Sequence, residues 1–133
     1  RGFTLIELLV VVAIIAILAS IAIPRFFYYK ERSNRGSMIA DARNAATTFE
    51  AYFVDFGTYG PAETRNAITG PGFDDWPDAD YRVKASRGNT LTAAIVADTT
   101  YSITVSNNRA GPGKSPLTLN STGNCSFADS SPC

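Results

Sequence analysis

Very few side chains in this sequence are of types that perform chemistry. The chain contains no His, which is the most frequent general base and the most frequent metal ligand in proteins. It contains only two Cys. Neither cysteine has a base nearby in the sequence, and no Gly-rich phosphate loop follows a predicted strand. We therefore expect no enzymatic activity, no cofactor and no bound metal.

Glu7 is the residue that most needs a chemical explanation. It precedes an apolar stretch, residues 8–23, in which Ser20 is the only polar side chain. An ionised carboxylate in hydrocarbon costs a few kcal/mol and usually faces a partner. If the chain is cleaved after Gly2, the new α-amino group of Phe3 lies one helical turn away, and that amine on a neighbouring copy is a suitable counter-charge. The alternative is that Glu7 lies at the head-group interface, near the positive end of the helix dipole.

The stretch that contains Glu7 is long enough to cross a membrane. Counted from Phe3 to Ile23, it spans about 31 Å as a helix, against roughly 30 Å of bilayer hydrocarbon. A helix is the physical choice because a lone strand leaves its backbone unpaired in lipid. A cleaved secretory signal with Ser20-Ile21-Ala22 as its cleavage box is an alternative, but the apolar and aromatic residues continue to Tyr29. An ordinary membrane anchor would explain the length of this stretch, but it would not explain the acidic residue Glu7.

Beyond Pro24 the pattern becomes that of a helix with one apolar face. The apolar positions are Met38, Ala42, Ala45, Phe49, Tyr52 or Phe53, and Phe56. The opposite side carries Lys30, Glu31, Arg32, Arg35, Asp41, Arg43 and Glu50. We expect a single helix from Phe3 to Phe56, with a kink or an unwound stretch at Pro24 and Gly57 as its C-terminal cap.

The remainder of the chain has the pattern of a small antiparallel sheet. Residues 57–77 are rich in Gly and Pro and indicate a connecting loop. Strand patterns follow at 81–85, 91–97 and 101–106, with a fourth at 117–120. We expect an α+β fold in which three or four strands cover the apolar face of the helix, because so few residues bury too little surface alone.

The N-terminal residues resemble a known family. The run Arg1-Gly2-Phe3-Thr4-Leu5-Ile6-Glu7, the apolar stretch and the pair Ile23-Pro24 look like the class III signal and N-terminal helix of type IV pilins, in particular of type IVa major pilins. The resemblance covers roughly the first 30 residues. It implies cleavage by a prepilin peptidase between Gly2 and Phe3, N-methylation of Phe3, and assembly roles for Phe3, Glu7 and Pro24.

The resemblance also implies an organisation and a function. The expected parts are a leader remnant at 1–2, a transmembrane and polymerisation helix at 3–24, an amphipathic helix at 25–56, an αβ-loop at 57–77, the sheet at 78–124 and a C-terminal loop at 125–133. Such a bacterial subunit waits in the inner membrane and is polymerised by the pilus assembly machinery into an extracellular filament for motility, adhesion or surface attachment. A surface receptor is a further partner that the resemblance allows.

Two other functions stay open at this point. One is a pseudopilin of a type II secretion system, and the other is a membrane-anchored monomeric binding module. The twelve basic residues balance the twelve acidic ones, so the whole chain has no net attraction for nucleic acid, and we expect none as a partner.

Cys125 and Cys133 are the only two cysteines, and an exported chain meets an oxidising compartment in which they can join. We predict one disulfide, worth roughly 2 to 3 kcal/mol in the chain-entropy model. A zinc site is disfavoured because two Cys without His make half of one. In pilins a disulfide-bounded region of this kind lies on the filament surface.

Aromatic residues are concentrated along the predicted helix. They are Phe26, Phe27, Tyr28, Tyr29, Phe49, Tyr52, Phe53, Phe56 and Tyr59, together with Phe3. Some pilins similar to this chain are argued to conduct electrons through such rings. We favour subunit packing, because large rings bury the most surface.

Asp74, Asp75, Asp78 and Asp80 form an acidic cluster. Carboxylate oxygens of this kind can hold Ca²⁺, but no EF-hand spacing is present. We interpret the cluster as a solvated acidic loop.

Overall fold

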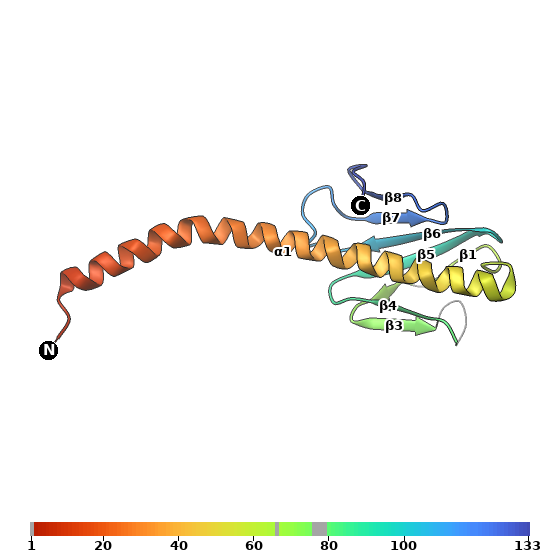
Figure 1. The fold of residues 1–133 in the computed structure, drawn as a ribbon, viewed down its shortest axis with the longest axis horizontal. Coiled ribbons are helices and arrows are strands. Elements are labelled where there is room, and N and C mark those ends of the chain that lie inside the picture. Colours follow the sequence, from red (N-terminus) through yellow and green to blue (C-terminus); the bar gives the residue numbers. More distant parts are fainter. Residues whose placement is uncertain (1, 66, 76–79) are drawn as a thin grey trace.

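The computed structural model describes residues 2–65, 67–75 and 80–133. Its dominant element is helix α1 (Leu5–Phe56), which has 52 residues and a length of about 78 Å. The N-terminal half projects away from the rest of the molecule, and the C-terminal half lies across a sheet (Figure 1). We call the projecting half the stalk and the remainder the head.

Both ends of α1 are set by local chemistry. Thr4 is extended and caps the helix, accepting the Glu7 N–H on its side chain while Glu7 reaches back to the Thr4 backbone, which is a capping box. The helix therefore begins two residues after the expected start at Phe3. Gly57 ends it in a left-handed conformation (φ 72°), and its N–H donates to the Phe53 carbonyl at 2.7 Å.

Pro24 lies inside α1 without interrupting it. The helix is continuous on both sides of the proline and bends gradually (Figure 1), so the expected unwound stretch is not present. A proline removes one helical hydrogen bond, and the carbonyl that loses its donor belongs to Ser20. Ser20 is itself exposed on the stalk.

The sheet is larger than the three or four strands expected. Its strands are β1 (Glu63–Thr64), β2 (Ile68–Thr69), β5 (Thr90–Ala97), β6 (Thr100–Ser106), β7 (Leu117–Asn120) and β8 (Cys125–Phe127). The order is β1-β5-β6-β7-β8, with β2 also on β5, and a separate pair joins β3 (Gly72–Asp75) to β4 (Arg82–Ala85). All these pairings are antiparallel. The α+β class is confirmed, and the added strands come from the segment expected as a loop and from the C-terminal tail.

The core lies between one face of α1 and one face of the sheet. Met38, Ala42, Ala45 and Phe49 supply the helix side. Alternate residues supply the sheet side, among them Leu91, Ala93, Ile95, Tyr101, Ile103, Val105 and Leu117. Phe56, expected on this face, is exposed, and its ring lies against Tyr52 and Tyr81.

The loops of the head lie at two ends of the sheet. The β4–β5 turn and the β6–β7 loop lie towards the stalk, since Ser86 bonds Asp41 and the Arg109 carbonyl bonds Asn34. The β5–β6 turn lies at the far end, where Tyr59 N–H donates to the Asp98 carbonyl at 2.8 Å. The strands thus run along α1, which fixes the height of each loop on the helix.

Candidate assembly site

The uncovered stalk is the most distinctive surface of the molecule. Its large apolar side chains are exposed, from Phe3 (91 % exposed) through Ile23. The helix is long and apolar enough to cross a membrane by length and composition, with a mean hydropathy of 3.0 in its most apolar window and none of that window buried. An apolar surface of this size needs lipid or protein to cover it.

Glu7 is already engaged within its own subunit. Its Oε2 atom accepts the Thr4 N–H and the Thr4 hydroxyl, each at 2.8 Å. Among the described residues no cation bonds this carboxylate, so its charge is solvated by dipoles and not neutralised. The sequence Thr4-Leu5-Ile6-Glu7 has the capping-box pattern. That pattern could have predicted the contact between Glu7 and Thr4 from the sequence.

The aromatic residues form two separate groups. Phe26, Phe27, Tyr28 and Tyr29 are all exposed at the base of the stalk. The second group surrounds the end of α1, where Phe49 stacks on Tyr101 with centroids 5.0 Å apart and Phe53 lies 4.7 Å from Tyr59. No aromatic residue lies between Tyr29 and Phe49, a distance of about 30 Å along the helix.

Glu50 organises the second group. Its Oε1 atom accepts the hydroxyls of Tyr59 and Tyr101, both at 2.9 Å. Burial, followed by this carboxylate, raises the pKa of Tyr59 to about 12 and raises the pKa of Tyr101 for the same reasons. Two neutral tyrosines thus hold the last turns of α1 against the head.

A buried polar network joins α1 to both loops at the stalk end of the head. Asp41, expected on the solvated side, is only 4 % exposed, which corrects that expectation. Its carboxylate accepts the Ser86 N–H and hydroxyl at 2.7 Å and the Asn89 amide at 2.6 Å. Asn89 in turn accepts the Asn107 amide at 2.6 Å. The donors come from distant segments, so helical periodicity alone could not distinguish Asp41 from a solvated acid.

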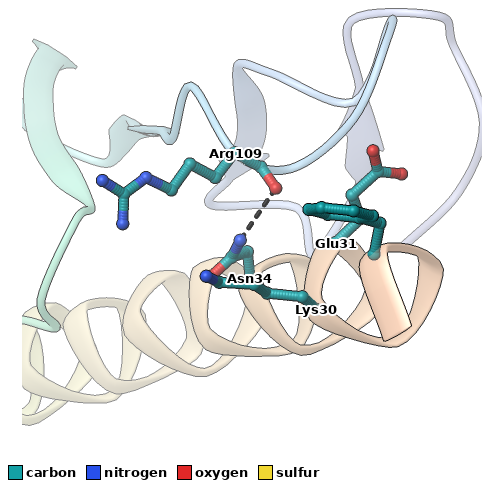
Figure 2. Close-up of a pocket in the computed structure, with 5 residues that line it drawn as sticks. Lys30, Glu31, Asn34 and Arg109 are labelled. Carbon is teal, nitrogen blue, oxygen red and sulfur yellow. Dashed lines mark hydrogen bonds between the residues drawn. The ribbon is translucent and has the colours of Figure 1, made fainter. Parts of the chain in front are cut away.

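A pocket of about 220 Å³ lies where the stalk meets the head. Figure 2 shows Lys30, Glu31 and Asn34 along α1, with Arg109 above them, and the Asn34 amide donating to the Arg109 carbonyl at 2.8 Å. The lining is a mixture of one ring, charges and an amide. The hydrogen bond from Asn34 to Arg109 holds the β6–β7 loop on the helix. Among these lining residues no nucleophile lies beside a base.

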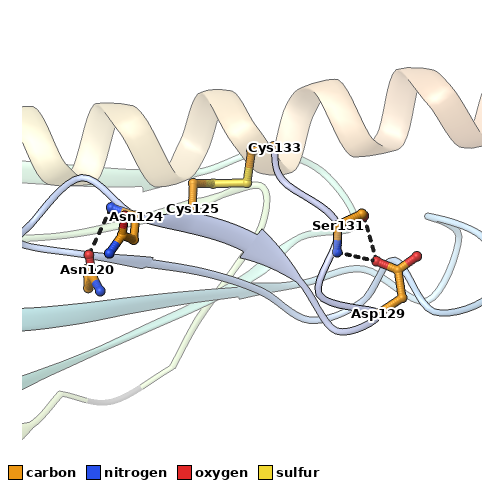
Figure 3. The surroundings of a disulfide bond; sticks show 6 residues. All are labelled: Asn120, Asn124, Cys125, Asp129, Ser131 and Cys133. Atoms are coloured by element: carbon orange, nitrogen blue, oxygen red, sulfur yellow. Dashed lines mark hydrogen bonds between the residues drawn. A yellow bond between two sulfur atoms is a disulfide. The ribbon is translucent and has the colours of Figure 1, made fainter.

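The tail is closed by the predicted disulfide. Cys125 and Cys133 are bonded, with Cα atoms 5.5 Å apart, and Figure 3 shows the bond close to α1. Ser131 donates to Asp129 Oδ1 through its N–H at 3.0 Å and its hydroxyl at 2.6 Å. Lys114 lies 2.5 Å from Asp129 Oδ2, and these contacts, led by the lysine, lower the pKa of Asp129 to about 2.

The acidic cluster gathers no metal site in the part of the chain that is described. Asp75 pairs with Arg82 at 3.1 Å, and Asp78 lies outside the described residues. No group of three or more metal-ligating side chains occurs within residues 2–65, 67–75 and 80–133. Arg1, the first residue of the expected leader remnant, also lies outside the described residues.

A long helix, apolar and uncovered in one half and packed on an antiparallel sheet in the other, defines a stalk-and-head subunit. Residues 1–23 match the prokaryotic N-terminal methylation motif. The chain is 32 % identical over 116 residues to the type IV major fimbrial protein FimA of Dichelobacter nodosus, covering 71 % of this chain and 70 % of FimA. The chain therefore belongs to the type IV pilin family.

Two further relatives match over shorter stretches of the chain. The type IV major pilin protein PilA of Myxococcus xanthus is 44 % identical over 59 residues, which cover 44 % of this chain and 27 % of PilA. The type II secretion system core protein G of Pectobacterium carotovorum is 33 % identical over 63 residues, covering 47 % of this chain and 40 % of that protein. This chain thus spans about a quarter of PilA. No solved structure matches it.

Proposed function

We propose that this chain is the major structural subunit of a type IV pilus, held in the inner membrane by its stalk and then polymerised into an extracellular filament. The observation that carries the proposal is the stalk itself, whose exposed apolar side chains suit lipid before assembly and other stalks after it. Motility, adhesion or surface attachment, with or without a surface receptor, is the use we propose for such a filament.

Processing is part of this proposal. A prepilin peptidase cuts between Gly2 and Phe3, and Phe3 is then methylated. The extended conformation of Thr4 and the high exposure of Phe3 support this step, because a protease needs an accessible, non-helical bond. The released amine supplies a cation near Glu7, and Pro24 shapes the stalk for packing.

The test combines electron microscopy of cell-surface filaments with mass spectrometry of their subunit. We expect filaments containing this chain, with a subunit mass of residues 3–133 plus one methyl group. Finding the chain only as a membrane-bound monomer would favour the anchored binding module and sink the pilin proposal.

A matched pair of variants separates the two roles of Glu7. Thr4→Ala removes the cap while keeping the carboxylate, and should cost the helix about 1 kcal/mol while filaments still form. Glu7→Ala removes the charge and leaves the Thr4 hydroxyl able to accept the N–H of residue 7, and it should abolish filaments. Equal filament yields from both variants would show that Glu7 only caps the helix.

A pseudopilin is the second candidate, favoured by the match to the secretion system core protein G. It would assemble a short structure within the cell envelope, so long surface filaments decide between the two. The terminal Cys pair favours the pilin. For either subunit we infer a structural role without catalysis, cofactor or nucleic-acid partner.

A further inference from the structure

The basic residues of the chain are unevenly placed, and one group of them surrounds the junction between the stalk and the head. Some of these residues follow one another along α1 directly after the apolar stretch, and the others come from the β6–β7 loop. All of them are exposed or half-buried. We call this group the basic collar, and its members are Arg25, Lys30, Arg32, Arg35, Arg109 and Lys114.

The basic collar surrounds the helix. Lys30 and Arg32 are two positions apart, which is roughly 200° around α1, so they point to opposite sides. On the first side Arg109 lines a pocket together with Lys30 (Figure 2). On the second side Lys114 lines a groove of about 410 Å³ together with Arg32 and Arg35. The positive charge is therefore presented on both flanks of the helix.

Few carboxylates offset the charge of the basic collar. Asp129 pairs with Lys114. Glu31 packs against the backbone of the β6–β7 loop, where a Cβ added to Gly111 would lie 2.7 Å from its Oε2 atom. The ion pairs of the described residues join no other member of the collar. Six cations set against these two carboxylates leave an excess of positive charge at the junction.

The far end of the head has the opposite sign. Asp55 lies in the last turn of α1, Glu63 begins β1, and Asp98 lies in the β5–β6 turn. Arg65 pairs with Glu63, which leaves this end acidic. The balance of twelve basic and twelve acidic residues over the whole chain therefore conceals a dipole along the head, with its positive end next to the stalk.

The basic collar lies at the height of a bilayer surface. If the apolar stretch up to Ile23 fills the hydrocarbon, Lys30 follows about 10 Å further along the helix, and its side chain leans back towards the stalk. The four exposed aromatic residues at 26–29 lie between these two levels, and tyrosine is a residue that favours the membrane–water interface. Cations directly beyond such a belt of rings meet the phosphates of the lipid head groups.

We propose that the basic collar binds the phosphate head groups of anionic phospholipids in the membrane that the stalk spans. Guanidinium groups recognise phosphate through paired hydrogen bonds, and Arg32 and Arg35, about one helical turn apart, line the same groove. The inference rests on the membrane stage of the proposed function and deepens it, because it names the class of lipid that holds the unassembled subunit. The contact orients that subunit with the acidic end of its head away from the membrane.

Lipid retention by the full chain in detergent tests this binding. The protein is offered equal amounts of phosphatidylglycerol and phosphatidylcholine with the same acyl chains, and native mass spectrometry counts the lipids that remain bound. Lys30→Gln/Arg32→Gln removes two exposed charges of the collar while keeping long polar side chains. The matched control, Arg43→Gln/Lys84→Gln, removes two exposed charges of the head outside the collar.

We expect the wild-type chain and the control to retain several-fold more phosphatidylglycerol than phosphatidylcholine, and the collar variant to lose most of this preference. Added salt should weaken the preference by screening. No preference in the folded wild-type chain, or equal preferences in the collar variant and the control, would overturn the proposal. It would also be overturned if inorganic phosphate displaced the lipid more strongly than sodium chloride of the same ionic strength, or if a short DNA duplex were retained in preference to the lipid.

Fluorescence quenching in vesicles tests the geometry. Asn108→Cys in the β6–β7 loop and Asp98→Cys at the far end of the head, both at exposed positions, carry the same dye, and the quencher is a nitroxide on the lipid head group. We expect stronger quenching at position 108 than at position 98, and stronger quenching in vesicles that contain phosphatidylglycerol than in pure phosphatidylcholine. Quenching at position 108 that is equal in the two kinds of vesicle would contradict the proposal.

Both tests use the unassembled full chain, so failure of this inference can be separated from failure of the proposed function. A chain that is released from the vesicles by carbonate extraction would overturn the membrane stage, and the inference with it. A chain that stays in the vesicles and shows no lipid preference would overturn the inference alone.

Discussion

Asp41 on helix α1 accepts the side-chain amide of Asn89, 48 residues further along the chain, at 2.6 Å. Asn89 carries the connection on to Asn107. All three side chains are buried, and no cation lies among these partners. The carboxylate thus ties α1 to two loops of the head through hydrogen bonds alone.

Replacing Asp41 by Ala should destabilise the head by roughly 1 to 3 kcal/mol, because it removes the acceptor of the Ser86 N–H and hydroxyl and one of the two acceptors of the buried Asn89 amide. Urea unfolding of the full chain in detergent, followed by near-ultraviolet circular dichroism, measures the loss. Arg43→Ala, at an exposed position two residues away, should change stability by less than about 0.5 kcal/mol. Equal effects of the two variants would contradict the network.

Reducing the disulfide between Cys125 and Cys133 should cost roughly 2 to 3 kcal/mol, since it releases the short loop that the bond closes in the unfolded chain. The urea midpoint, measured with and without reductant, gives the value. A Cys125→Ser/Cys133→Ser double variant should match the reduced protein and should not respond to reductant. A response in that variant would point to another cause.

Acid should loosen the tail over a defined pH range. The pKa of Asp129 is lowered, chiefly by Lys114, from 3.8 to about 2. The contribution of this carboxylate is therefore fully present above its unfolded pKa near 4 and is lost as the pH falls through about 2. Amide hydrogen exchange at Ser131, corrected for intrinsic rates, should accelerate across this range. Lys114→Met should move the acceleration to higher pH, and an unchanged profile would separate the tail from the lysine.

Filaments purified without cytochromes should carry the same current after Phe26, Phe27, Tyr28 and Tyr29 are all changed to Leu. The reason is the gap of about 30 Å between these rings and the group around Phe49, which leaves no continuous ring contact along a subunit. The conductance of filament preparations with and without the four substitutions, matched in amount, tests this expectation. A clear drop in current would revive electron transport through aromatic contacts between copies.

The elements with strong local signals were predictable from the sequence. The alternation in β5 and β6 and the apolar stalk were recognised, and β7 was predicted at its observed bounds of Leu117–Asn120. By contrast, β1 and β2 have two residues each and exist because β5 offers them an edge. Such pairing is tertiary and leaves little trace in a local pattern.

The residues of the candidate site were easier to predict from the sequence than the contacts that they make. The exposed stalk and Glu7 were identified from apolarity alone. Asp41 was misplaced because its position on α1 borders the apolar face, and only its partners, Ser86 and Asn89, make burial favourable. Its burial therefore depends on a turn of the head that lies far along the chain and folds back onto the helix.

The C-terminal tail has a consequence for how this protein avoids misassembly. Ser126 on β8 forms an antiparallel bridge with Pro132, and the disulfide holds the tail in that position. An open sheet edge is a template for strand addition by another chain, and here that edge is occupied, with a proline that has no N–H to offer. Strand-by-strand aggregation is thereby disfavoured at β8, and the exposed apolar half of α1 is left as the surface open to self-association.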